Sequence, residues 1–113
     1  MPKTRVILEL GSGNDLHGSD YTKAALRAVQ DALHHSSMPF VRTLKIDKTK
    51  VDVEVTIGVQ RPERVDLDAI KKSLPLGNVT VKAVKGGLEI PNDAGTNSTL
   101  IANACVVVSL DVA

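Results

Sequence analysis

The sequence of 113 residues has little of several residue types, and each shortage excludes a class of protein. Its single cysteine, Cys105, excludes an intramolecular disulfide framework and a cysteine-rich zinc site. Its two aromatic residues, Tyr21 and Phe40, are too few for the stacking platforms of RNA-binding modules. A net charge of +1, with 14 Lys and Arg against 13 Asp and Glu, gives no electrostatic reason to expect nucleic-acid or membrane binding.

The sequence also lacks a long hydrophobic run. Its longest uncharged apolar run, residues 104–108, is far shorter than the roughly 20 residues that span a bilayer. Residues 1–10 lack the long apolar region and the small-residue cleavage site of a signal peptide. We therefore expect a cytoplasmic protein with one domain over residues 1–113, because this length suits one globular core.

Hydrophobic periodicity predicts alternating strands and helices. A period of two predicts strands at residues 5–10, 42–47, 51–60, 79–83, 88–90 and 100–112. Apolar spacings of three and four residues predict helices at 21–35 and 67–74, which Asp20 and Asp66 would cap. Segments 11–20 and 91–99 are rich in Gly, Asn, Asp, Ser and Thr, which predicts two polar loops.

The order strand, helix, strand, strand, helix, strand, strand predicts an α+β fold. We expect a two-layer sandwich, with two helices on one face of a mostly antiparallel sheet, either ferredoxin-like or chorismate-mutase-like. The second face of the last strand would carry Ile101, Cys105 and Val107. Such a surface usually marks an interface, so we expect a homo-oligomer. The alternative is ordinary sheet surface, since single exposed apolar residues are normal.

The segment from Gly11 onward holds the candidate functional site. Gly11 and Gly13 flank Ser12 and would let the backbone turn sharply and approach a ligand closely. Asp15 and His17 are two residues apart, so in an extended chain their side chains point to the same side. A carboxylate beside an imidazole suits metal ligation or general acid–base catalysis.

The helix expected to start near Tyr21 would add an anion site to this segment. Its first N–H groups and its positive dipole end would lie just after Gly18 and Asp20. The alternative is purely structural. In that case Asp15 closes a turn with its side chain, His17 packs locally, and the glycines only shape the loop.

Residues 11–18 read Gly-Ser-Gly-Asn-Asp-Leu-His-Gly, which fits the pattern Gly-x-Gly-x-Asp-x-His-Gly. This pattern resembles the signature of the Lin-type family of conserved hypothetical proteins from bacteria and plants. The resemblance continues through residues 23–32 and extends more weakly over most of the chain. It implies a site at Asp15 and His17 without implying an activity, a substrate or a cofactor.

Residues 13–17 are also similar, more distantly, to the Asp-x-His element of methylerythritol cyclodiphosphate synthase, a trimeric zinc enzyme. The helix histidine that completes that zinc site corresponds to Arg27 here. Arginine cannot ligate a metal but binds carboxylate or phosphate well. The resemblance therefore implies an anion pocket with Asp15, His17 and Arg27, and we assign no metal ligand. The alternative for Arg27 is a solvated pair with Asp31, four residues further on.

The leading hypothesis is an oligomeric small-molecule enzyme or ligand-binding protein for a small anion. Its catalytic residues would be Asp15 and His17, and no cofactor or reaction is indicated. The alternative is a non-catalytic assembly module whose polar loop shapes a subunit interface. The predicted ligand-binding residues are Gly11, Ser12, Gly13, Gly18, Asp20, Arg27 and, from the last strand, Asn103.

Overall fold

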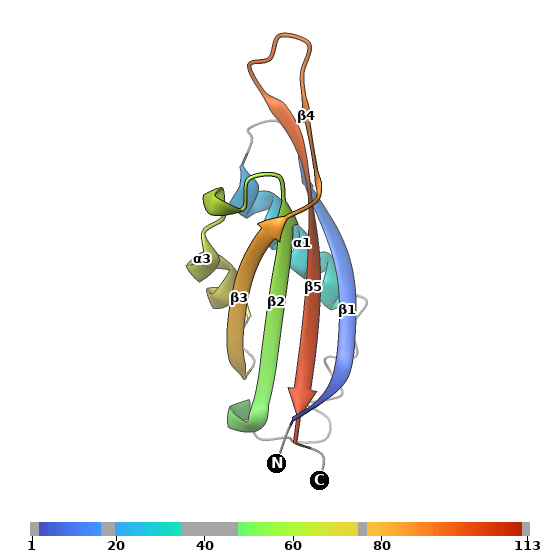
Figure 1. The fold of residues 1–113 in the computed structure, drawn as a ribbon, viewed down its shortest axis with the longest axis vertical. Coiled ribbons are helices and arrows are strands. Elements are labelled where there is room, and N and C mark those ends of the chain that lie inside the picture. The colour runs from blue at the N-terminus through green and yellow to red at the C-terminus, as the bar shows by residue number, and fades with distance from the viewer. Residues whose placement is uncertain (1–2, 17–19, 35–47, 75–76, 112–113) are drawn as a thin grey trace.

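A computed structural model describes residues 3–16, 20–34, 48–74 and 77–111 (Figure 1). The predicted strand at 42–47 and the predicted helix end at residue 35 lie outside these residues. The helices and strands of the described residues are β1 (Thr4–Asp15), α1 (Tyr21–His34), β2 (Val51–Val59), α3 (Leu67–Lys72), β3 (Asn78–Lys85), β4 (Leu88–Pro91) and β5 (Ser98–Leu110). Two short 3-10 turns, η1 (Lys48–Lys50) and η2 (Pro62–Arg64), flank β2.

The predicted two-layer α+β sandwich is confirmed. The strands are ordered β1-β5-β2-β3, with β4 paired to β5. Only β2 and β3 pair in parallel among the described strands, so the sheet is mostly antiparallel. The parallel strands are neighbours joined through α3, whereas a ferredoxin-like sheet has a split βαβ unit, so the described order departs from that alternative.

The core lies between the sheet and α1, as the alternation of the central strands predicts. Val51, Val53, Val55, Ile57 and Val59 of β2 are all buried, as are the six even-numbered residues of β5 from Leu100 to Leu110. The N-cap predicted for the second helix is also confirmed, because the Asp66 carboxylate accepts from Ala69 N at 3.2 Å. Among the described residues, no helix is long and apolar enough to cross a membrane.

The first strand differs from its prediction. We expected it to end at residue 10 with a polar loop from Gly11, but β1 continues to Asp15. The register also shifts between Arg5 and Ile7, as at a β-bulge. Ile7 consequently faces the helices and is buried, whereas Leu8 lies on the opposite face and is exposed.

A two-stranded arm of β4 and β5 gives the molecule its length, 56 Å against 22 and 19 Å in the other directions. Figure 1 shows this arm projecting beyond the rest of the sheet. The chain between β3 and β4 crosses the end of β2, where the Gln60 side-chain amide donates to the Gly86 and Gly87 carbonyls at 3.1 Å each. These bonds fix the base of the arm to the end of β2.

Candidate functional site

The first two glycines of the motif lie under α1, where no side chain fits. A Cβ added at Gly11 would be 2.9 Å from Ala32 Cα and closer still to backbone atoms of Ala28 and Ala32. One added at Gly13 would be 2.5 Å from Ala24 O and closer still to Ala28 N. All three alanines are fully buried. The strand and the helix therefore touch backbone to backbone, and this contact requires glycine at both positions.

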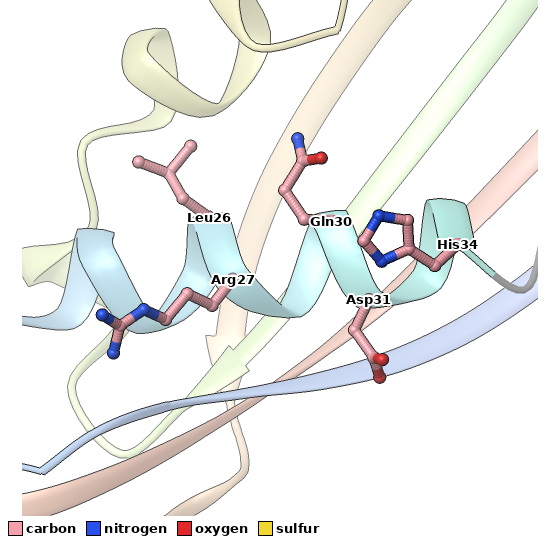
Figure 2. Close-up of a pocket in the computed structure, with 5 residues that line it drawn as sticks. All are labelled: Leu26, Arg27, Gln30, Asp31 and His34. Atoms are coloured by element: carbon pink, nitrogen blue, oxygen red, sulfur yellow. The ribbon is translucent and has the colours of Figure 1, made fainter.

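Two charged side chains of α1 bond the backbone of β1. Ser12 N donates to the Asp31 carboxylate at 2.9 Å, and the Arg27 guanidinium donates to Asn14 O at 2.7 Å. Figure 2 shows Arg27 and Asp31 leaving the helix toward β1. Leu26 and Gln30 point the other way, and all four residues line a shallow hollow together with His34. Arg27 therefore satisfies a backbone carbonyl on the outer edge of β1, and a charged side chain at such an edge protects it from pairing with another strand.

Asp15 is the buried polar residue of the site. Its side chain accepts from Asp20 N at 2.8 Å, and Lys23 Nζ lies 3.6 Å from its other oxygen. Asp20 in turn accepts from Lys23 N at 3.0 Å, which confirms it as the N-cap of α1. Asp15 therefore closes the connection from β1 to α1. His17 and Gly18 lie outside the described residues, so their position relative to Asp15 stays a prediction.

A second carboxylate lies in the same row of the sheet as Asp15. Leu100 of β5 pairs with Asp15 on one side and with Glu89 of β4 on the other. Neighbouring strands are about 4.8 Å apart, so the two acidic residues stand on the order of 10 Å from each other at their Cα atoms. Both share the face of the buried Leu100, beneath the first turn of α1.

The first turn of α1 reaches Glu89 through a buried tyrosine. The Tyr21 hydroxyl donates to one oxygen of the Glu89 carboxylate, and the Ser98 hydroxyl donates to the other at 3.4 Å. The Arg64 guanidinium lies over the Tyr21 ring, 5.5 Å from its centroid. Burial, and after it the bond to Glu89, raises the pKa of Tyr21, while the charge of Arg61 and a hydrogen bond from Arg64 act in the opposite direction. Tyr21 therefore stays a hydroxyl donor at neutral pH.

Residues 5–108 match the model of a family described as "Conserved hypothetical protein (Lin0512_fam)". The chain belongs to this family. The Lin-type resemblance is thereby confirmed, whereas the similarity to methylerythritol cyclodiphosphate synthase stays a hypothesis. A crystal structure of an FtsZ-like protein of unknown function from Nostoc punctiforme is 32% identical, with 98% of each chain covered and a TM-score of 0.83. The comparison with curated proteins found no match.

The structure of this Lin0512 protein separates the predicted site residues. Asp15 and Asp20 lie together at the start of α1, and Gly11 and Gly13 lie beneath it. Ser12 and Asn103 face each other across β1 and β5, in a row next to the buried Ala102 and Gly13. Since side chains alternate along a strand, this row is on the opposite face from Asp15. In the described part of the chain, no three His, Cys, Asp or Glu side chains are grouped as for a metal ion.

Sequence reasoning missed the Tyr21–Glu89 pair, with Ser98 and the two arginines beside it. Tyr21 and Glu89 are 68 residues apart, and only the pairing of β4 with β5 brings them together. One local signal was present in this Lin0512 sequence. Glu89 is an acidic residue in an otherwise apolar short strand.

Tyr21 is expected to titrate above its usual pKa of about 10. Because it is the single tyrosine and the chain has no tryptophan, tyrosinate absorbance reports it alone. The pKa of Tyr21 is higher in the folded protein than in the unfolded chain. The protonated Tyr21 hydroxyl therefore contributes fully to stability at a pH below the pKa of the unfolded chain, and this contribution is lost as the pH rises through the pKa of the folded protein.

Glu89→Gln should lower the pKa of Tyr21 part of the way toward the usual value. The substitution removes the charge but keeps an oxygen that accepts the bond, and burial is unchanged. Glu54→Gln, at an exposed position of β2, is the matched control and should leave the pKa unaltered. Equal Tyr21 titration curves for the wild type and Glu89→Gln would show that the pair is absent in solution.

Proposed function

We propose that this Lin0512 protein is an oligomeric ligand-binding protein or enzyme for a small anionic molecule, with its site at the start of α1. The observation that carries the proposal is the group of cations at the first turn of α1, where the Arg64 guanidinium lies over the Tyr21 ring and Lys23 stands beside Asp15, at the two ends of the row of Asp15 and Glu89. His17 follows Asp15 by two residues and belongs to the same proposal.

The cations around the row support an anionic ligand. Arg61 precedes η2 and Arg64 ends it, both are exposed, and both act to lower the pKa of the Tyr21 hydroxyl, although its net shift is upward. Lys23 is half-exposed beside Asp15. Guanidinium groups bind carboxylate and phosphate with two parallel hydrogen bonds, so two of them near one hydroxyl donor suit such a ligand.

The paired groups also support proton transfer. Tyr21 is a protonated donor at neutral pH, and a carboxylate accepts its hydrogen bond. Asp15 lies at the other end of the row with Lys23 as its counter-ion. Tyr21 and Asp15 are buried, so a ligand at the start of α1 would have to displace the bond from Tyr21 to Glu89 in order to use the donor and carboxylates that general acid–base catalysis needs.

Anion binding is tested by thermal unfolding with inorganic phosphate, pyrophosphate and citrate. At about ten times its dissociation constant, a ligand should raise the midpoint by roughly 5 °C, since such binding stabilises by about 1.4 kcal/mol. Arg64→Gln should remove this shift. Arg5→Gln, at an exposed position of β1 away from the row, is the matched control and should keep it. Loss of the shift in both variants, or no shift with any anion, would refute the site.

A non-catalytic assembly module is the second candidate, and a specific observation favours it. Four of the residues discussed above hold α1 against β1, which is a structural role. Gly11 and Gly13 allow the close backbone contact, and Arg27 and Asp31 bond the β1 backbone. His17→Ala separates the candidates. In a ligand site it removes the anion-induced shift and leaves the fold intact, whereas in an assembly module it leaves any such shift unchanged.

A further inference from the structure

We propose that the sheet face opposite the helices, here called the open face, binds a second copy of this chain. This deepens the oligomeric part of the proposed function and does not depend on the ligand site. The open face presents, from four strands, the apolar side chains of Leu8, Leu10, Val84, Leu88, Ile101, Cys105 and Val107, with Ile90 at the arm.

The exposed hydrophobic residues gather on this face. In the part of the chain that the structure describes, eight large apolar side chains are exposed, and five of them belong to the open face. Leu10 is 64% exposed and Leu88 is 57% exposed, so in a monomer both apolar side chains would be in contact with water. Cross-strand pairing joins Leu8 to Val107, Leu10 to Cys105 and Leu88 to Ile101. The apolar side chains thus gather along β5 and its neighbours β1 and β4, on a face where the row of Ser12 and Asn103 and the β2 residues Glu54 and Thr56 are polar.

The open face approaches the size of a stable interface. Four strands at about 4.8 Å and about nine residues at roughly 3.3 Å each give a face of roughly 600 Å² before side-chain relief is added. A stable interface buries about 800 Å² on each partner, so side-chain relief and the arm would have to supply the remaining quarter. Two such faces packed about 10 Å apart would form an aligned β-sandwich.

The charges at one end of the face favour a second copy over an unrelated partner. Arg5, Ser109 and Asp52 form one row across β1, β5 and β2, so opposite charges stand on either side of β5. Asp52 is 3.3 Å from Lys3 but keeps 44% of its side chain exposed. A two-fold axis along β5 would exchange the two sides and place each Arg5 over the other copy's Asp52.

The arm extends the same surface beyond the body. Leu88 and Ile90 belong to β4, and Tyr21 holds the intervening Glu89 against α1. The bonds from Gln60 to the chain just before β4 fix the arm further. The arm is thus held in line with the sheet, and its apolar side chains continue the open face.

Leu10→Lys tests the surface by sedimentation velocity of the full chain. The wild type should sediment as a dimer or larger at about 20 μM, and the substitution should weaken association at least about 100-fold, since it replaces the most exposed leucine of the face with a charge. Leu67→Lys, the same change at an exposed leucine of α3, is the matched control and should leave association unchanged. A monomeric wild type at about 100 μM overturns the proposal, as does unaltered association of Leu10→Lys.

A charge exchange tests whether the occupant is a second copy. Arg5→Asp and Asp52→Arg should each weaken association about tenfold, and the double variant should restore it, because rim charges of opposite sign then face each other again. Asp52→Arg also removes the ion pair with Lys3 and the hydrogen bond from Asn78, so circular dichroism of each variant must show that it folds. Additive weakening in the double variant overturns this arrangement. The anion-induced thermal shift should survive in all these variants, which separates failure here from failure of the ligand site.

Discussion

Gly13→Ala is expected to lower the free energy of unfolding by at least about 3 kcal/mol, a large part of the 5–15 kcal/mol typical of a domain. The added methyl group would be 2.5 Å from Ala24 O and closer to Ala28 N, so α1 would have to move away from β1. Separating the two elements opens the packing of a buried alanine stripe, and overpacking of this kind costs about 1–3 kcal/mol even where side chains can adjust. At Gly13 the methyl group would clash with backbone atoms of α1, which cannot rotate out of the way as a side chain can.

Gly58→Ala is the matched control for this prediction. It makes the same substitution in a strand of the same sheet, but its Cβ would be 3.4 Å from Gly86 Cα, which is ordinary contact. We expect it to change the free energy of unfolding by less than about 1 kcal/mol. Urea unfolding followed by circular dichroism measures both variants. Equal free energies for the two variants would mean that α1 does not rest on Gly13.

The motif glycines also show why the sequence misplaced the end of β1. Two glycines within three residues predict a turn on local grounds, and Ser12, Asn14 and Asp15 strengthen that prediction. The structure instead uses the glycines in an extended strand, because Ala28 and Ala32 come within backbone distance of them. That contact joins residues about 15 to 20 positions apart, so no local pattern reveals it.

Features that depend on local spacing were predicted well. The alternation of β2 and β5, the N-caps Asp20 and Asp66, and the two-layer class all follow from periods of two and 3.6 or from helix-start chemistry. The apolar second face of β5 was also predicted, because it needs only the same period. The bulge between Arg5 and Ile7, by contrast, changes which residues of β1 are buried and has no clear sequence signal.

Only the part of the candidate site that lies within one local segment was predicted from the sequence. Asp15 and Asp20 were found because both belong to one segment with a recognisable motif. Glu89 was not, because its neighbourhood depends on the register of β4 against β5 and on the docking of α1. The row from Asp15 through Leu100 to Glu89 therefore required the tertiary structure, although each residue is unremarkable alone.

Asp15→Ala is expected to destabilise the fold by about 2 kcal/mol, because Asp20 N loses its acceptor and Lys23 loses its counter-ion at a buried position. Asp20→Ala, which removes only the N-cap bond to Lys23 N, should cost about 1 kcal/mol and serves as the comparison. Urea unfolding measures both. Equal costs for the two variants would show that Asp15 contributes no more than a surface cap.

Asp15→Asn then separates the structural role of this residue from a functional one. The amide oxygen can still accept from Asp20 N, so stability should fall by less than about 1 kcal/mol. If Asp15 acts on a ligand through its charge, the anion-induced thermal shift should change in Asp15→Asn even though the fold is intact. A shift identical to that of the wild type would assign Asp15 to the connection between β1 and α1, and would leave the Tyr21–Glu89 pair and the arginines as the site.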